Sequence, residues 1–287
     1  TVQIWTVFLY NGGMEEKVYT TPLGDIHYWI QWKGKDAQTL VFLPGLTADH
    51  RLFDKQIEYF ANKANLFVWD APGHASSYPF SLRFSMDDEA RWLMAILREN
   101  GFSNFVLVGQ SLGGYIGQVF TQLFPGALQG FVAIDSAPLQ RCYITKAELW
   151  LLKRMEPVYR YLPWQWLLKQ GTRGVATTEY GRKLMRSMML VYDGDQPRYA
   201  ALSGHGFRML AEAIETNRPY SLTCPVLLIC GTKDQAGSCR RYAKAWHKKT
   251  GFPLVWIEKA GHNSNTDAPA QVNSCIERLM NSARKNT

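Results

Sequence analysis

The stretch Phe105-Val106-Leu107-Val108-Gly109-Gln110-Ser111-Leu112-Gly113-Gly114 decides the fold of this 287-residue chain. Its first four residues are continuously apolar, as in a strand that helices cover on both faces, and the helical run 115–120 follows. Between them lies the pattern G-x-S-x-G, in the strand, turn and helix context that holds a serine on a strained backbone. Ser111 is therefore the candidate nucleophile; the alternative is an ordinary strand-to-helix turn with a capping serine.

Two polar side chains further along the chain complete a candidate triad with Ser111. A serine at its normal pKa attacks poorly, so it needs a base within hydrogen-bond reach and a third group that orients the base. His262 follows the apolar run 254–258, and Asp234 follows the run 226–230. Both are expected at the carboxyl edge of the sheet, where open α/β sheets bind ligands. Asp135 also ends a strand-like run, but the loop context of Asp234 and its position before the histidine favour Asp234 as the acid.

A third segment offers the backbone donors that an acyl-transfer site needs for its oxyanion. The run 39–43 ends in Pro44-Gly45-Leu46-Thr47. We predict that the amides of Leu46 and Leu112 form the oxyanion hole. The alternative interpretation of this segment is a Pro-Gly turn that only ends a strand.

Short β-branched and aromatic runs recur at intervals that leave room for a helix between them, which is typical of a mostly parallel sheet. Helices are expected to begin after Ser85, with acidic residues in the first turn, and near Pro269. We predict an α/β fold with an eight-stranded central sheet flanked by helices, with strands at 18–20, 26–32, 39–43, 66–70, 105–109, 131–135, 226–230 and 254–258.

The alternation of strands and helices stops between residues 139 and 220, where the chain is aromatic and basic. We predict core domains at 1–138 and 221–287 and an inserted helical cap at 139–220. Part of the apolar surface of the cap should face the catalytic cleft. Gln110, Trp164 and Trp166 are the predicted substrate-binding side chains; the alternative is that the tryptophans only pack the cap onto the core.

Composition restricts the class of protein. Hydrophobic residues make up 46% of the chain, which suffices for one large core. The five cysteines are an odd number without a C-x-x-C pair, which argues against a disulfide framework and a structural zinc site and favours a reducing, cytoplasmic setting. No apolar run is long enough to cross a bilayer. Met14 offers a plausible start, so residues 1–13 are expected to be an extension, a tag or a processed end.

The charge of the chain gives little indication of a macromolecular partner. The formal net charge is +8, but the basic residues are scattered, and no aromatic and basic recognition motif accompanies them. We therefore expect no nucleic-acid partner. The predicted mechanism of Ser111, His262 and Asp234 implies no metal and no organic cofactor. A small-molecule acyl substrate is the expected partner, and the oligomeric state is left open.

Taken together, these motifs resemble those of the α/β-hydrolase superfamily from about Lys17 to Lys285. The matching segments are Leu43-Pro44-Gly45-Leu46, Asp70-Ala71-Pro72-Gly73-His74, the turn at Ser111, Gly231-Thr232-Lys233-Asp234 and Gly261-His262. The resemblance implies a cap-containing serine hydrolase, similar to carboxylesterases, that cleaves a hydrophobic ester or related acyl compound through an acyl-enzyme. It does not determine the substrate, because this fold serves many reactions.

At three places this sequence departs from the patterns of particular family members, and these departures narrow the range of expected reactions. Pro44-Gly45 stands where family members usually have His-Gly. Ser111 argues against haloalkane dehalogenases and epoxide hydrolases, which carry an aspartate in the turn. Tyr115 stands where members that make the menaquinone precursor usually have a basic residue. A cofactor-independent carbon–carbon hydrolase or lyase, a perhydrolase of the haloperoxidase type and a binding protein that kept the fold remain alternatives.

Overall fold

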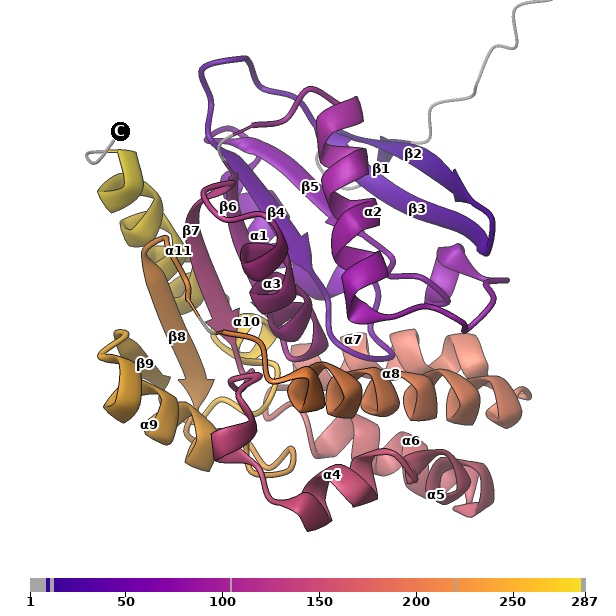
Figure 1. Cartoon of the computed structure of the whole chain (residues 1–287). Coiled ribbons are helices and arrows are strands. Elements are labelled where there is room, and N and C mark those ends of the chain that lie inside the picture. The colour runs from indigo at the N-terminus through magenta and orange to yellow at the C-terminus, as the bar shows by residue number, and fades with distance from the viewer. Residues whose placement is uncertain (1–8, 11–12, 104, 220, 285–287) are drawn as a thin grey trace, which may run out of the picture.

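The computed structural model describes residues 9–10, 13–103, 105–219 and 221–284, whose strands form one nine-stranded sheet (Figure 1). Its strand order is β1-β2-β3-β5-β4-β6-β7-β8-β9. The pairs β1–β2, β2–β3 and β3–β5 are antiparallel, and all other neighbouring pairs are parallel. The strands are β1 (Leu9–Tyr10), β2 (Met14–Thr21), β3 (Gly24–Gln31), β4 (Thr39–Leu43), β5 (Asn65–Trp69), β6 (Phe105–Gln110), β7 (Leu128–Ile134), β8 (Val226–Gly231) and β9 (Leu254–Ile257).

The mostly parallel sheet of the sequence prediction is confirmed, with one strand more than expected. Each of the eight predicted strands corresponds to one of β2–β9, and the antiparallel hairpin joins Thr21 to Gly24. The ninth strand is β1, which pairs only two residues with Glu15 and Met14. β1 has no counterpart among the predicted strands, because a two-residue strand is too short to carry a period-two pattern.

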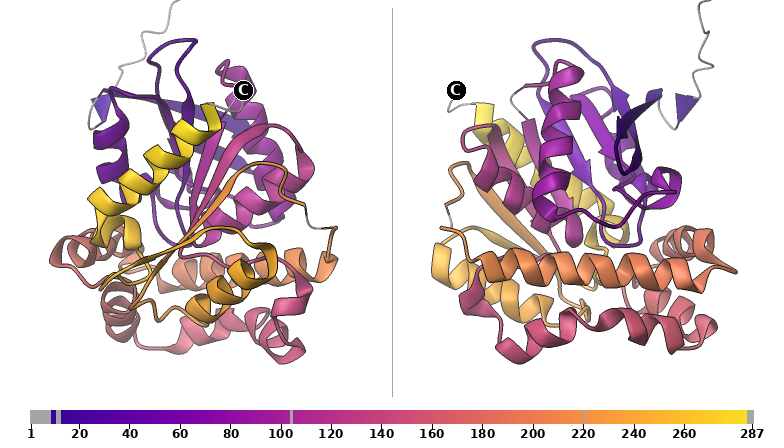
Figure 2. Two further views of the ribbon diagram at one scale, coloured as in Figure 1. Left: turned by 90° about the vertical axis from the view of Figure 1, so that its left-hand side faces the viewer. Right: turned by 45° about the vertical axis from the view of Figure 1, so that its right-hand side comes forward.

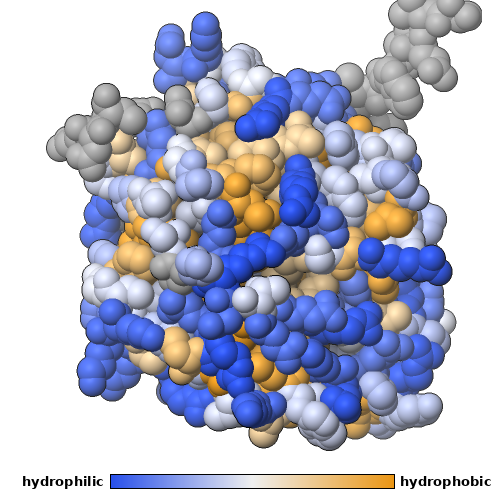
Figure 3. Space-filling model, in the orientation of Figure 1, coloured by the Kyte–Doolittle hydropathy of each residue, from blue (hydrophilic) through white to orange (hydrophobic). Residues whose placement is uncertain are grey.

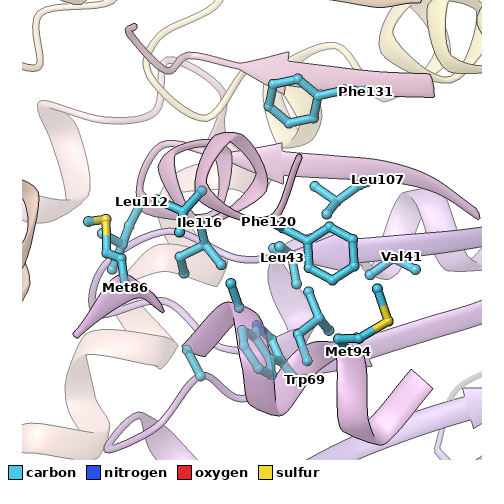
Figure 4. Packing of buried hydrophobic residues seen from close by; sticks show 14 of the residues in the cluster. Val41, Leu43, Trp69, Met86, Met94, Leu107, Leu112, Ile116, Phe120 and Phe131 are labelled. Carbon is cyan, nitrogen blue, oxygen red and sulfur yellow. The ribbon is translucent and has the colours of Figure 1, made fainter. Parts of the chain in front are cut away.

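Helices cover both faces of the sheet (Figures 1 and 2). Alternate residues of each central strand belong to opposite cores, as Leu40 and Val41 of β4 illustrate. One core, seen in Figure 4, includes α2 (Met86–Glu99), α3 (Leu112–Leu123) and Trp246 of α9 (Cys239–Thr250). The other includes α1 (Asp54–Phe60) and α11 (Pro269–Arg284). Burial on both faces explains why these strands are continuously apolar.

Two helices, α2 and α11, begin where the sequence predicts, and residues at their N-termini explain why. The Ser85 side chain caps α2 by accepting from the amide of Asp88 at 3.3 Å, and Asp88 Oδ2 accepts from the Ser85 amide at 2.9 Å. This reciprocal pair satisfies two N–H groups that the first turn of a helix leaves unpaired. The last long helix begins at Pro269 as expected, because a proline at the first position sacrifices no helical hydrogen bond.

Among the described residues between β7 and β8, the secondary-structure elements are all helices, joined by loops. Figures 1 and 2 show them gathered at the end of the sheet to which the parallel strands point. They are η3 (Arg141–Tyr143), α4 (Lys146–Leu152), α5 (Met155–Tyr161), α6 (Trp164–Arg173), α7 (Glu179–Met189), η4 (Leu190–Tyr192) and α8 (Gln196–Thr216). The remaining short helices are η1 (His50–Phe53), η2 (Ala75–Ser77) and α10 (Ser264–Asp267). The cap boundaries at 139 and 220 stay a prediction.

Hydrophilic side chains dominate the face of the molecule drawn in Figure 3, where hydrophobic ones form separate patches. Within the described ranges, every helix falls short of the length and apolarity that crossing a bilayer requires.

Candidate active site

Ser111 lies on the sharp turn between β6 and α3. Its φ of 49° and ψ of −113° are sterically costly for a residue with a side chain. Two glycines permit the close approach of strand and helix. A Cβ atom on Gly109 would lie 2.3 Å from the carbonyl oxygen of Gly113, and one on Gly113 would lie 2.0 Å from that of Leu43. The turn therefore depends on both glycines, and it presents Ser111 at the N-terminus of α3.

The three predicted triad side chains meet at the carboxyl ends of β6, β8 and β9. His262 Nε2 lies 2.9 Å from Ser111 Oγ, and His262 Nδ1 lies 2.9 Å from Asp234 Oδ2. The amide of Ala236 donates to Asp234 Oδ1 at 2.8 Å, which holds the carboxylate in place. The arrangement is chemically capable of passing the proton of Ser111 to His262 while Asp234 fixes the ring.

Burial and the Asp234 carboxylate act in opposite directions on the charge of His262. Burial alone lowers the pKa of the imidazole, but the Asp234 carboxylate raises it, and the net pKa lies above the usual 6.5. The pKa of Asp234 lies below its usual value: burial raises it, and the charge and hydrogen bond of His262 more than offset that rise. Asp234 is thus ionised wherever His262 titrates.

Asp135, the other candidate for the acid, accepts hydrogen bonds from backbone amides rather than from the ring of His262. Its Oδ1 accepts from the amide of Gly231 at 2.8 Å, and its Oδ2 accepts from the amide of Ser264 at 2.9 Å. These bonds join the end of β7 to the loops that carry Asp234 and His262. Burial and the nearby Asp234 charge raise the pKa of Asp135.

The loop after β4 lies beside the serine turn. A Cβ atom on Gly45 would come within 3.1 Å of Ser111 Cβ. Among the described residues, the amides of Leu46 and Leu112 donate no hydrogen bond, so both are available to an oxyanion. The Leu46 side chain packs on α8, because a Cβ atom on Gly206 would lie 2.6 Å from it. The loop after β4 therefore packs between the serine turn on one side and α8 on the other.

A pocket of about 330 Å³ opens over Ser111 and His262. The described residues that line it include no Asp, Glu, Lys or Arg. An unpaired charge is costly to bury away from water, so this lining favours an uncharged ligand. The lining residues are Leu46, Thr47, Ala48, Gln110, Ser111, Tyr159, Trp166, Leu167, Gln170, Gly171, Val175, Met185, Tyr199, Ser203, Phe207, Ala236, His262 and Asn263.

The three predicted substrate-binding residues have different surroundings. Trp166 lines the pocket, whereas Trp164 is absent from its lining and donates from Nε1 to Asp193 Oδ1 at 2.8 Å. Gln110 lines the pocket, but its amide nitrogen donates to the carbonyl oxygen of His262 at 2.8 Å and to Asn263 Oδ1 at 3.2 Å. Gln110 thereby ties the serine turn to the histidine loop.

Sequence reasoning missed several polar residues of the pocket, among them Tyr199 and Ser203 of α8. Their spacing of four residues places them on one face of a helix. That spacing was readable in the sequence, but it does not tell which face of α8 turns toward Ser111.

Among the residues that the structure describes, two groups of buried side chains carry atoms of the kinds that bind metals. One is Cys230, Asp234 and Cys239, and the other is Asp49, His50 and Asp70. In the second group, His50 Nδ1 already lies 2.8 Å from Asp70 Oδ1. In the first, Asp234 already contacts His262 and Ala236. Protein partners thus already engage both groups.

Comparisons with known proteins agree with this architecture. A sequence model of the alpha/beta hydrolase fold matches residues 38–269. The 2-succinyl-6-hydroxy-2,4-cyclohexadiene-1-carboxylate synthase of Escherichia coli O1:K1 / APEC is 35% identical over 84% of this chain and 93% of its own length. The 3-oxoadipate enol-lactonase 2 of Acinetobacter baylyi is 25% identical over 85% of this chain and 89% of its own. A thermophilic esterase from Thermogutta terrifontis has a TM-score of 0.74 at 19% identity, covering 94% of this chain and 98% of the esterase.

Proposed function

Because this chain belongs to the alpha/beta hydrolase family, we propose that it is a serine hydrolase that cleaves an uncharged carboxylic ester or a related acyl compound. The hydrogen-bonded series Ser111–His262–Asp234, at the floor of a pocket without charged lining residues, is the observation that carries the proposal. Family membership by itself does not determine the reaction, since one fold hosts many chemistries.

In the acylation step, Ser111 Oγ attacks the scissile carbonyl carbon while His262 Nε2 takes the hydroxyl proton. The carbonyl oxygen becomes an oxyanion, which the amides of Leu46 and Leu112 stabilise together with the positive end of α3. His262 then gives the proton to the leaving alcohol as the carbon–oxygen bond breaks. An ester of Ser111 remains.

In the deacylation step, water takes the place of the alcohol. His262 removes a proton from the water, the hydroxide attacks the acyl carbon, and the same proton returns to Ser111 Oγ as the acid leaves. Asp234 keeps Nδ1–H directed away from the serine, so that Nε2 presents its lone pair in each cycle.

The helices between β7 and β8 serve as the cap in this proposal. Tyr159, Trp166 and Phe207 line the pocket from these helices, and an apolar roof favours apolar acyl or alcohol groups. The absence of Asp, Glu, Lys and Arg from the described lining speaks against charged or peptide substrates.

The carbon–carbon lyase is the second candidate, because the E. coli O1:K1 / APEC synthase is 35% identical to this chain. The name of that enzyme describes a carboxylate product, and an enzyme that binds a carboxylate benefits from a cationic side chain. Tyr115 occupies the position where such members usually carry a basic residue, and the described pocket lining has no Lys or Arg. These two features favour the hydrolase.

A fluorophosphonate probe tests the proposed nucleophile. Only a serine activated by a base beside an oxyanion hole reacts readily with such an electrophile. Intact-mass spectrometry is expected to show one adduct per chain, and peptide mapping is expected to locate it at Ser111. A folded protein that stays unlabelled at excess probe would disprove the serine-hydrolase proposal and favour the binding-protein alternative.

The two predicted tryptophans should respond differently to replacement by alanine. Trp166→Ala removes apolar surface from the pocket, and each methylene group buried there contributes about 0.8 kcal/mol. We expect it to lower kcat/KM for an octanoyl ester about tenfold more than for an acetyl ester. Trp164→Ala is the comparison variant: it should lower the melting temperature, because Trp164 bonds Asp193 and packs on Tyr199. It should leave the ratio of octanoyl to acetyl ester hydrolysis intact, because Trp164 is absent from the pocket lining and neither ester carries a second oxygenated group. An unchanged ranking in Trp166→Ala would refute the pocket assignment.

A further inference from the structure

We propose that the hydroxyl groups of Thr47, Tyr199 and Ser203 form a polar subsite that binds an uncharged oxygen on the substrate, a hydroxyl or carbonyl group separate from the scissile bond. All three residues line the pocket that contains Ser111. The inference rests on the proposed function and narrows its substrate class to oxygen-substituted acyl compounds.

Ser203 provides the first observation. The residue is only 1% exposed, and among the described residues its Oγ makes no hydrogen bond of ordinary geometry, although it lies close enough to the Tyr199 phenol to lower the pKa of that group. A buried hydroxyl without a well-aligned partner is unusual and destabilising. Other helical hydroxyls of this chain bond back to their own helix, as Thr121 does to Gly117 and Thr250 to Trp246, each at 2.8 Å. Ser203 Oγ is therefore available to a ligand.

Tyr199 lies one helical turn before Ser203, and its ring is fixed by aromatic neighbours. The ring centroids of Tyr159, Trp164 and Tyr192 lie 5.7, 5.4 and 5.4 Å from that of Tyr199. Burial raises the pKa of the Tyr199 phenol, and the nearby hydroxyls of Thr47 and Ser203 offset part of that rise. The phenol thus stays neutral at physiological pH and is able both to donate and to accept a hydrogen bond.

Thr47 sets the position of the subsite relative to the reaction. It directly follows Leu46, whose amide is assigned to the oxyanion hole, and it has a positive φ of 61° that is uncommon for threonine. Leu46, Thr47 and Ser111 line the same pocket, and adjacent Cα atoms are about 3.8 Å apart, so Thr47 borders the part of the pocket where the oxyanion would form. An oxygen bound here lies close to the scissile carbonyl rather than at the far end of an acyl chain.

The charge of the surroundings selects a neutral oxygen. The described pocket lining contains no Lys or Arg to balance a carboxylate and no Asp or Glu to balance an ammonium group. The hydroxyl groups of the subsite are able to hydrogen-bond a hydroxyl or carbonyl group of the substrate. Binding either group avoids the cost of burying a net charge away from water. A site built to hydrogen-bond such a group discriminates strongly against an analogue that lacks it.

Matched esters test the subsite. Methyl 3-hydroxybutanoate and methyl 3-oxobutanoate each have a methyl-substituted counterpart of similar size, methyl 3-methylbutanoate. The rates are to be normalised to hydroxide-catalysed hydrolysis. We expect the wild-type protein to prefer at least one oxygenated ester by tenfold or more in kcat/KM, and Tyr199→Phe and Ser203→Ala each to reduce that preference by about fivefold to tenfold. Thr216→Ala on the same helix is the control, because the Thr216 hydroxyl bonds Ala213, and it should leave the preference unchanged.

Thermal unfolding separates a binding role from a structural one. Ser203→Ala removes a hydroxyl that makes no hydrogen bond of ordinary geometry among the described residues, so the melting temperature should change little. A clear fall in melting temperature with an unchanged preference would overturn the subsite, as would a wild-type protein that hydrolyses all three esters at equal normalised rates. A protein that hydrolyses none of them and resists the fluorophosphonate would overturn the proposed function as well.

Discussion

Replacing Ser111 by alanine is expected to lower kcat by about 10⁶-fold, the loss seen when the nucleophile of a serine protease is removed. The variant should fold normally, because alanine keeps the Cβ atom and the turn is held by the bond from the Ser111 amide to the Ile134 carbonyl at 2.9 Å. The measurement is kcat for a nitrophenyl ester together with the melting temperature. Some activity over water should persist, since the oxyanion hole and the binding pocket remain.

Ser136→Ala is the matched control for Ser111→Ala. The Ser136 hydroxyl donates to the Ser111 carbonyl at 2.9 Å, so it borders the same turn without contacting His262. We expect this variant to stay within about tenfold of the wild type, as loss of one ordinary hydrogen bond suggests. Equal activity in Ser111→Ala and wild type would place the nucleophile elsewhere.

Asp234→Asn should lower kcat by about 10⁴-fold, equivalent to roughly 5.5 kcal/mol, because the amide favours the wrong tautomer of His262 and does not stabilise its charged form. The pH profile gives a second measurement. Asp234 raises the pKa of His262, and the base acts only when neutral, so wild-type activity rises with pH through a pKa above 6.5. Without the carboxylate that pKa falls, and the acid limb of the residual activity should move to lower pH.

Asp135→Asn is the matched control for Asp234→Asn. In the wild-type protein, the two carboxylate oxygens of Asp135 accept one hydrogen bond each from the amides of Gly231 and Ser264. An asparagine has only one acceptor oxygen, so its NH₂ group would face one of these two amides. We expect a loss of stability of about 1–3 kcal/mol and a loss of kcat of less than about tenfold. An inactive, folded Asp135→Asn beside an active Asp234→Asn would transfer the acid role to Asp135.

Local patterns were enough to predict the sheet and its helices. The apolar run before Ser111, the capping residues at Ser85 and Pro269 at the start of the last helix each act within a few residues, so they are readable without tertiary structure. The two-residue strand β1 was missed because it forms only through its partners Glu15 and Met14. Burial on the two faces of β4 likewise agrees with its unbroken apolar sequence.

The sequence by itself determined a mostly parallel α/β sheet and a short set of candidates, Ser111, Asp234, His262 and the amides of Leu46 and Leu112, since motif chemistry resides in neighbouring residues. Only the tertiary structure decided which carboxylate contacts His262, why Gln110 bonds the histidine loop and that Trp166, rather than Trp164, lines the pocket. It also brought Thr47 together with Tyr199 and Ser203 around that pocket. Several of these relations join residues far apart in the sequence, as Gln110 and His262 do, and their geometry depends on the packing of whole helices, which no local pattern encodes.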